Sequence, residues 1–249
     1  MALTDHDSLA GLDEAARSAA DCGITLVRGC EVSCLAQTGG SMHVLAYFIE
    51  HDDGPLPDEL ARLRHDRVER NQRLAARLTE VGIPVDYQAL VDAAGGEEGL
   101  GRPHFARYLV DNGIATSIQD AFDRWLGSGK PAYVPKARVL PGDIARLARA
   151  SGGVAVLAHP LSLGLDTAGL EHVVRELAAS GFVGIEAFYG RYSPEERRAL
   201  AELAARTDLV ATGGSDYHGT LKPDLQVGVG TGDLAVPDSV LDALAARRI

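Results

Sequence analysis

Short apolar runs alternate with amphipathic segments in the N-terminal and C-terminal parts of the chain. The runs have the length and β-branched content of buried strands, which predicts strands over 24–32, 43–48, 153–160, 183–188 and 209–216. A helix is predicted before the first strand, over 7–23, and further helices between the later strands, over 141–151, 168–180 and 194–206. The last of these begins with Ser193 and Pro194 followed by two glutamates, a cap, a proline and an acidic first turn. The alternation is typical of βα units that build a sheet covered by helices.

The middle of the chain has a different pattern. It predicts a long, arginine-rich helix over 57–81 and shorter helices over 87–94, 103–112 and 117–126, with glycine-rich breaks and no strand. We therefore expect residues 1–53 and 136–249 to form an α/β domain, and residues 54–135 to form a helical insertion in it. Arginines recur along the long helix at 64, 67, 70, 73 and 77. We expect this face to be solvated and paired with acids rather than to bind an RNA backbone.

Charge and composition narrow the classes of function. The 249 residues carry 24 Lys and Arg against 35 Asp and Glu, a net charge of −11. Because binding over a whole surface needs excess cations, this balance argues against double-stranded DNA as a partner. No run approaches the roughly 20 apolar residues of a membrane helix, and the N-terminus lacks a signal-peptide pattern. We expect a cytoplasmic protein that does not bind membranes, and the sequence leaves its oligomeric state open.

Histidines beside predicted strands indicate the chemistry. Four of the eight, His6, His43, His159 and His218, stand at or beside strand ends, with acids such as Glu31 and Asp216 nearby. Because the carboxyl ends of parallel strands face one rim, we expect these side chains to converge. One histidine in such a place is more often a structural residue, but four in successive units favour a metal site. Imidazole and carboxylate together suit Zn, Mn or Fe.

Short motifs around these residues resemble those of the PHP family, the polymerase and histidinol phosphatase domain. They are TDHD (4–7), GCEVS (29–33), His43, AHP (158–160) and GSDYH (214–218), in the right order from residue 1 to about 230. The resemblance implies a distorted seven-stranded (β/α) barrel that hydrolyses phosphoesters at a trinuclear metal site. The insertion, with GRPHFARYLV (101–110) and GKPAYVP (129–135), is similar to one branch, nucleoside 3′,5′-bisphosphate phosphatases that also act as 5′→3′ exonucleases on short RNA.

The resemblance also implies a role for each matched residue. Glu31 would bridge two metals, His43 and His159 would complete the second, Asp216 would serve the first, and His6 and His218 the third. A full-length chain would hold up to three ions, with Mn favoured and Zn or Fe as alternatives. A metal-activated hydroxide would attack phosphorus, with no further catalytic side chain.

The substrate is expected to be a nucleotide or a short RNA. Arg102, His104 and Lys130 are the expected ligands of a second substrate phosphate, with solvated cations or helix caps as the alternative. Glu186 is expected either to orient a ligand histidine or to pair with an arginine.

One motif of the family has no counterpart here: an HxH pair followed by an Asp on the first strand. About one βα unit of roughly 30 residues is therefore missing. We expect the natural chain to begin upstream of Met1, and the alternative is a truncated PHP-fold binding module without activity. A small-metabolite phosphatase of the histidinol-phosphatase type also stays open. An amidohydrolase-like function ranks last, because none of the three lysines is a candidate for carbamylation at a strand end.

Overall fold

The computed structural model describes residues 1–35, 41–135, 139–219 and 222–248. The chain divides into two compact units. The sheet unit comprises Met1–Asp58 and Arg138–Ile249, and the helical unit comprises Glu59–Ala137. These units follow contacts within the chain, so the domain boundaries expected at 53/54 and 135/136 stay a prediction.

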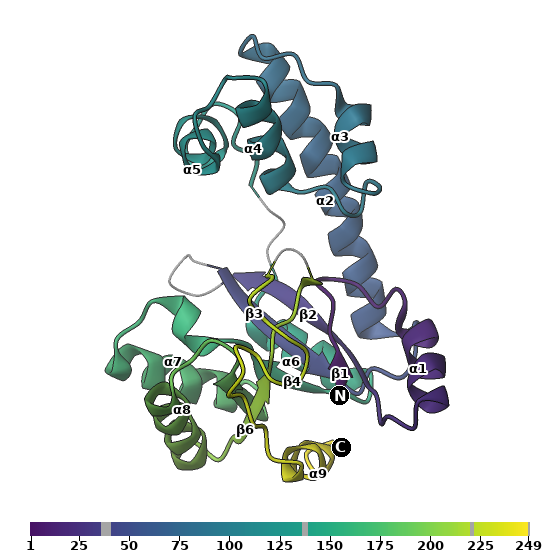
Figure 1. The fold of residues 1–249 in the computed structure, drawn as a ribbon, viewed down its shortest axis with the longest axis vertical. Helices are drawn as coiled ribbons and strands as arrows, with labels where there is room; N and C mark the ends of the chain where they lie inside the picture. Colours follow the sequence, from purple (N-terminus) through teal and green to yellow (C-terminus); the bar gives the residue numbers. More distant parts are fainter. Residues whose placement is uncertain (36–40, 136–138, 220–221, 249) are drawn as a thin grey trace. The chain divides into compact units, whose positions relative to one another are not determined.

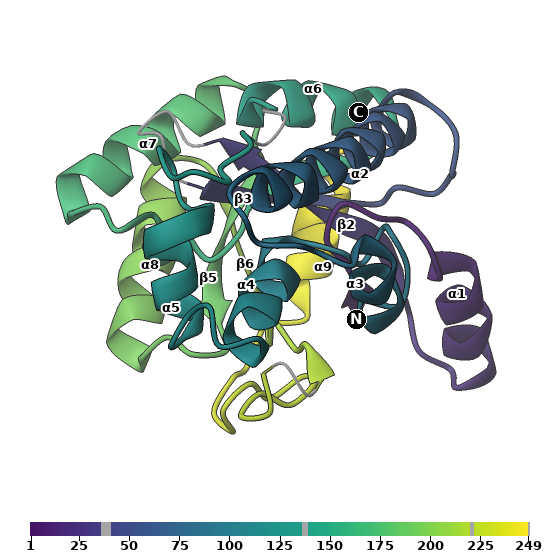
Figure 2. The same ribbon diagram turned by 90° about the horizontal axis from the view of Figure 1, so that it is seen from above.

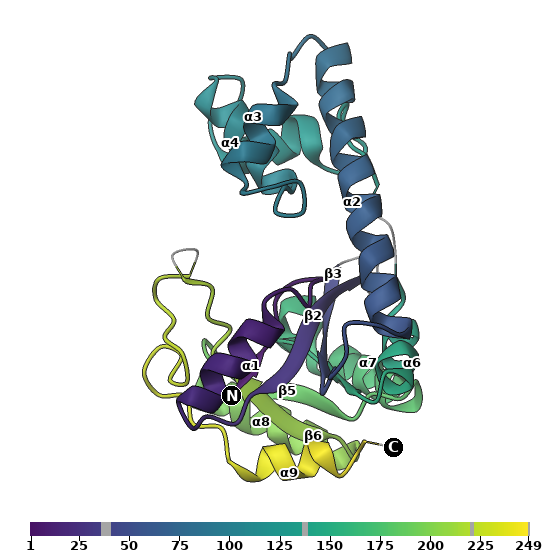
Figure 3. The same ribbon diagram turned by 90° about the vertical axis from the view of Figure 1, so that its right-hand side faces the viewer.

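The sheet unit is built on one curled, half-barrel sheet of six strands (Figures 1 and 3). Its strands follow the chain order: β1 (Ala2–Leu3), β2 (Val27–Leu35), β3 (Ser41–Tyr47), β4 (Val154–Leu157), β5 (Gly184–Tyr189) and β6 (Val210–Gly214). The fold is therefore α/β, as the sequence predicts. Its completion as a seven-stranded barrel stays a prediction.

Strand β3 departs from the parallel array that the sequence suggests. It runs antiparallel to both β2 and β4, whereas β1 is parallel to β2, and β4, β5 and β6 are parallel to one another. Only five residues separate β2 from β3 in the sequence, too few for the crossover connection that a parallel pair needs. The start of β3 therefore lies at the same edge of the sheet as the ends of β2 and β4.

Helices cover the sheet in the order of the strands that they follow. Helix α1 (Leu12–Asp21) packs on β2, α6 (Pro141–Ala150) on β3 and β4, α8 (Pro194–Arg206) on β5 and β6, and α9 (Ser239–Ala245) on β6. Helix α7 (Thr167–Ala179) contacts a short 3₁₀ turn, η2 (Pro160–Leu163). Figure 2 shows α6, α7 and α8 following one another around the strands. Val32, Val44, Val156 and Ile185 are fully buried in the core of this unit.

The helical unit contains α3 (Tyr87–Ala93), α4 (Arg102–Asp111), α5 (Ile118–Ala121), a π-helical turn η1 (Phe122–Leu126), and α2 (Pro55–Glu80) from Glu59 onward. Its core includes the fully buried Leu74, Leu78, Phe105 and Leu109. As predicted, its described residues form no strand. Nowhere in the described parts of the chain is a helix both long and apolar enough to cross a membrane.

Candidate metal centre

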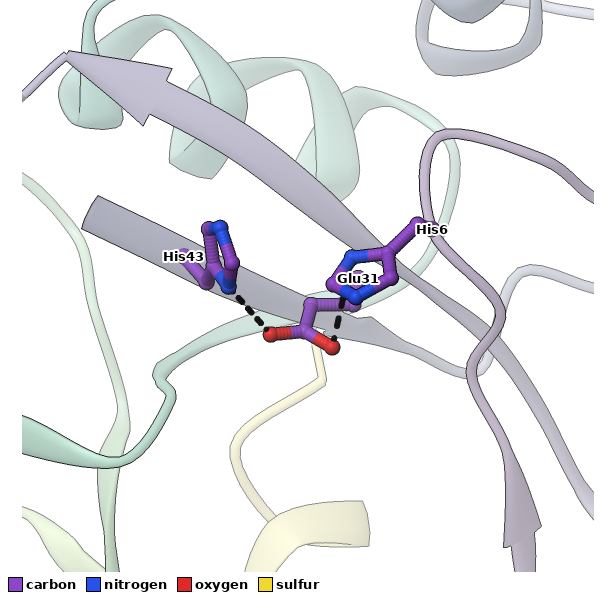
Figure 4. A group of neighbouring side chains, drawn as sticks. All are labelled: His6, Glu31 and His43. Atoms are coloured by element: carbon purple, nitrogen blue, oxygen red, sulfur yellow. Dashed lines mark ion pairs between the residues drawn. The ribbon is translucent and has the colours of Figure 1, made fainter. Parts of the chain in front are cut away.

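A buried carboxylate, that of Glu31 on β2, gathers three imidazoles around it. Its Oε1 lies 2.8 Å from His43 Nδ1 and 3.1 Å from His159 Nε2, and its Oε2 lies 3.5 Å from His6 Nδ1. Figure 4 shows His6 and His43 approaching the two oxygens of the carboxylate. Glu31 is only 5% exposed. Ligand atoms of His6, Glu31 and His43 lie within 4.8 Å of one another, which suits a single divalent cation.

The sheet topology explains why these residues meet. His6 follows β1 and forms a parallel bridge with Glu31. His43 pairs with Ser33 across β2 and β3, two positions from Glu31 on the same face. His159 follows the end of β4, and its neighbour Ala158 donates its N–H to the carbonyl oxygen of His43 at 3.1 Å. The reversal of β3 thus brings a residue from the start of one strand beside residues from the ends of two others.

His159 is held at three points, one through its backbone and two through its ring. Its backbone N–H donates to Glu186 Oε2 at 2.8 Å, its Nδ1 lies 2.8 Å from Ser162 Oγ, and its Nε2 faces Glu31. Glu186 therefore orients a histidine, through the backbone and not through the ring. Burial raises the pKa of Glu186 to about 8, although the bond from the His159 N–H favours the ionised form.

A second group adjoins the first through His6. The Nε2 atom of His218 lies 3.4 Å from His6 Nε2, and its Nδ1 lies 3.1 Å from Asp216 Oδ1. Asp216 Oδ2 accepts a bond of 2.6 Å from the Tyr189 hydroxyl and contacts the Lys222 ammonium. The structure thus brings together six residues for which the sequence predicts ligand roles: His6, Glu31, His43, His159, Asp216 and His218. Their roles as ligands remain a prediction.

Backbone strain is concentrated at this site. Among the described residues, five other than glycine have positive φ, and three of them are Asp7 (52°), His159 (27°) and Asp216 (53°). Such conformations cost about 1–3 kcal/mol each and persist where surrounding contacts enforce them. The Asp7 carboxylate is buried and accepts bonds from the backbone N–H and hydroxyl of Ser33, at 2.8 and 3.2 Å. Asp7 thereby ties the segment that carries His6 to β2, a role that no local pattern indicates.

The charge states of the cluster fit a divalent cation. Burial opposes ionisation of Glu31, but the bonds from His159 and His43 together with the His6 charge outweigh it, and its pKa lies well below its usual value. Burial lowers the pKa of His6, aided by His43 and His218, although Glu31 acts in the opposite direction. At neutral pH Glu31 therefore offers an ionised carboxylate and His6 a neutral imidazole, the forms that bind metals. At His159, by contrast, burial is outweighed by the bond to Glu31 together with the charges of nearby carboxylates, and the pKa is raised.

A pocket of about 500 Å³ opens beside the cluster in the sheet unit. It is lined by His43, His159, Leu161, Ser162, Tyr189, Arg191, Tyr192, Glu196, Asp216 and Lys222. This volume lies in the range of small-molecule sites. Histidines of the candidate centre form part of its wall, so a ligand in the pocket would contact them directly.

The three residues predicted to bind a second phosphate lie in the helical unit. Arg102 is the first residue of α4 and is partly buried, and Lys130 is exposed. His104 Nδ1 accepts a bond of 3.2 Å from the Gly101 N–H, as a helix cap does. Their substrate contacts stay a prediction.

One arginine of the α2 series does not lie on a solvated face. Arg70 is only 5% exposed, its Nη2 donates to Asn71 Oδ1 at 2.8 Å, and its Nε has no hydrogen-bond partner within the described ranges. Burial, with the nearby charges of Arg102 and Arg67, lowers its pKa to about 10. The expectation of a wholly solvated face is therefore wrong at Arg70. We call Arg67, Arg70 and Arg102 the arginine cluster.

A local signal for this burial exists in the sequence. Asn71, Leu74 and Leu78 follow a helical spacing of three and four residues and mark the apolar stripe of α2. Arg70 lies four residues before Leu74, on that stripe. Arg73, one position outside it, is exposed and pairs with Glu69 at 3.4 Å, as the sequence predicts.

The fold and the cluster together define an α/β protein. At one edge of its sheet it carries a candidate metal centre made of histidines and carboxylates. No family model matches the chain. Over 218 residues it is 34% identical to the 3′,5′-nucleoside bisphosphate phosphatase of Chromobacterium violaceum, with 88% of this chain and 76% of the relative covered. It is 32% identical over 219 residues to the 5′-3′ exoribonuclease of Haemophilus influenzae, with 88% and 78% covered. The chain belongs to the PHP-type family of metal-dependent phosphoesterases, which confirms the resemblance.

Solved structures share this fold. A protein from Bifidobacterium adolescentis, described as a candidate metal-dependent phosphoesterase, matches with a TM-score of 0.77 and 28% identity, covering 100% of this chain and 85% of its own. A Chromobacterium violaceum protein described as an amidohydrolase, with bound sulfate and no metal, matches with a TM-score of 0.76 and 31% identity, covering 100% and 86%. The first description names a phosphoesterase and the second an amidohydrolase. Both sequence relatives above, a phosphatase and an exoribonuclease, are named for the hydrolysis of phosphate esters.

Proposed function

We propose that this protein hydrolyses phosphate esters of nucleotides, either nucleoside 3′,5′-bisphosphates or the 5′ ends of short RNA. The observation that carries the proposal is the buried Glu31 carboxylate with three imidazoles around it. With Asp216 and His218 adjoining, these side chains would hold divalent ions, with Mn favoured over Zn and Fe, and a full-length chain would hold up to three. The ions, when bound, would lower the pKa of water and neutralise charge on the phosphate.

The protein's own groups have distinct tasks in this proposal. Ser162 and Glu186 hold His159 in its ligand orientation, and Asp7 holds the segment that carries His6. A second shell of this kind fixes ring orientation and basicity in metal sites. The pocket beside the cluster would receive the ester that is hydrolysed.

The arginine cluster supports a substrate with a further phosphate. Forked guanidinium groups suit phosphate oxygens, and the neighbouring charges of Arg70, Arg102 and Arg67 favour an anionic ligand. We assign Arg102 and Arg70 to this phosphate, together with His104 and Lys130. In this proposal residues 54–135 are a cap subdomain that supplies substrate contacts.

The direct test is phosphate release from adenosine 3′,5′-bisphosphate. Release is expected with Mn²⁺, is expected to stop when EDTA is added, and is expected to return when excess Mn²⁺ is restored. With 5′-phosphorylated RNA oligonucleotides the expected product is a nucleoside 5′-monophosphate, which chromatography measures, because cleavage of the first phosphodiester releases no inorganic phosphate. A Mn²⁺-loaded protein that hydrolyses neither substrate would favour a binding module over an enzyme.

A small-metabolite phosphatase is the second candidate. A substrate with a single phosphate ester could be hydrolysed in the pocket beside the candidate metal centre without contacts to a second phosphate. Replacing Arg102 by alanine is expected to lower kcat/KM on the bisphosphate by about 10–100-fold, the worth of one charged hydrogen bond. Turnover of histidinol phosphate or p-nitrophenyl phosphate should change little.

The matched control is Arg107→Ala on the same helix, an exposed arginine whose Nε lies 2.9 Å from Asp111. It should leave both substrates unaffected. An equal loss on mono- and bisphosphates in Arg102→Ala would argue that Arg102 does not read a second phosphate.

A further inference from the structure

Lys222 brings a positive charge to the pocket beside the candidate centre. Within the described part of the sheet unit it is the one lysine, since Lys130 lies in the helical unit. Its ammonium contacts Asp216 Oδ2, the oxygen that also accepts the Tyr189 hydroxyl. The Asp216 side chain is 9% exposed and that of Lys222 is 28% exposed. The lysine therefore approaches Asp216 from the accessible side.

The Lys222 ammonium lines the same pocket as two of the imidazoles. His43 and His159 belong to its wall, and so do Lys222 and Arg191. Arg191 is bound to Asp224 by two hydrogen bonds, of 3.0 and 2.7 Å. An ammonium carries three donors, and the contact with Asp216 accounts for one of those of Lys222. Among the described residues, Asp216 is the one acceptor of the Lys222 ammonium, so a ligand in the pocket can accept its remaining hydrogen bonds. The Arg191 guanidinium, by contrast, is already paired with Asp224.

We propose that Lys222 is a catalytic residue that binds the phosphate undergoing hydrolysis, with Asp216 as its partner when no substrate is present. This inference rests on the proposed function. Phosphoryl transfer spreads negative charge over the phosphate oxygens, and a fixed cation in a partly enclosed site stabilises that charge. The ammonium of Lys222 supplies charge and hydrogen bonds, and it forms no covalent bond to the substrate.

Titration with inorganic phosphate tests the proposal independently of turnover. In Mn²⁺-loaded protein, Lys222→Met is expected to weaken phosphate binding at least tenfold, and Lys222→Arg, which keeps the charge, is expected to restore it to within about threefold. The Mn²⁺ affinity of Lys222→Met should be unchanged or higher, because an ammonium no longer competes for Asp216. Arg175→Met, which removes a surface ion pair with Glu171 on α7, serves as the control.

Two outcomes would overturn the proposal. One is a phosphate affinity in Lys222→Met within twofold of the wild type. The other is a loss of Mn²⁺ affinity as large as the loss of phosphate affinity, which would make Lys222 a structural support for Asp216. If the wild-type protein hydrolyses no ester, the proposed function fails, and the phosphate titration still decides whether Lys222 binds phosphate.

Discussion

Replacing Glu31 by glutamine is expected to abolish Mn²⁺ binding at the centre and to lower phosphate release by at least about 100-fold, more than loss of an outer-shell partner costs. Glutamine keeps the shape of the side chain but removes the charge that three imidazoles surround. Its amide NH₂ would also face ring nitrogens where a carboxylate oxygen now accepts. Isothermal titration with Mn²⁺ and the bisphosphate assay measure the two effects.

The control for this substitution is Glu176→Gln on α7, a surface carboxylate that pairs with His172 at 3.4 Å. It should bind Mn²⁺ and release phosphate as the wild type does. If Glu31→Gln bound Mn²⁺ with wild-type affinity, Glu31 would not be a metal ligand, and the interpretation of the cluster as a metal centre would be wrong.

Replacing Arg70 by methionine is expected to stabilise the protein by about 1–3 kcal/mol, as replacement of buried charges by apolar groups often does. The guanidinium is buried, its Nε has no partner among the described residues, and Arg102 and Arg67 add like charge. Methionine has a similar length and fills irregular space. In the same variant, KM for the bisphosphate should rise at least tenfold, because a charged hydrogen bond to phosphate is lost. Urea unfolding and steady-state kinetics measure the two effects.

Arg73→Met provides the comparison for Arg70→Met, since it lies on the same helix, is 63% exposed and pairs with Glu69. Its unfolding free energy should change by less than about 0.5 kcal/mol, as for most surface positions. If Arg70→Met were instead destabilised and kept its substrate affinity, Arg70 would be a structural residue that holds Asn71, whose side chain bonds Leu100 O at 2.8 Å.

Much of the fold could be predicted because its signals are local. Helix α8 begins at Pro194 and ends at Arg206, as predicted, because Ser193 and Glu196 form a capping box and the proline suits the first turn. The five longer strands were predictable from apolar runs. The two-residue strand β1 was missed because it is too short for a periodic pattern, and helix α9 was not predicted either.

The site divides in the same way. The identities of the candidate ligands came from short motifs around strands, and family membership followed from them. By contrast, the bond from Asp7 to Ser33 spans 26 positions, and that from Tyr189 to Asp216 spans 27. Neither has a sequence pattern of its own, because each depends on how distant segments pack.

The sequence by itself determined the elements, the α/β class and the types of side chain available for metal chemistry, since hydrophobic periodicity and caps act over a few residues. The tertiary structure alone decided that Asp7 is bonded to Ser33 and that Lys222 contacts Asp216. These features depend on the burial and pairing of groups far apart in the chain. Burying a polar side chain costs free energy unless the protein provides hydrogen-bond partners, and those partners come from distant parts of the chain.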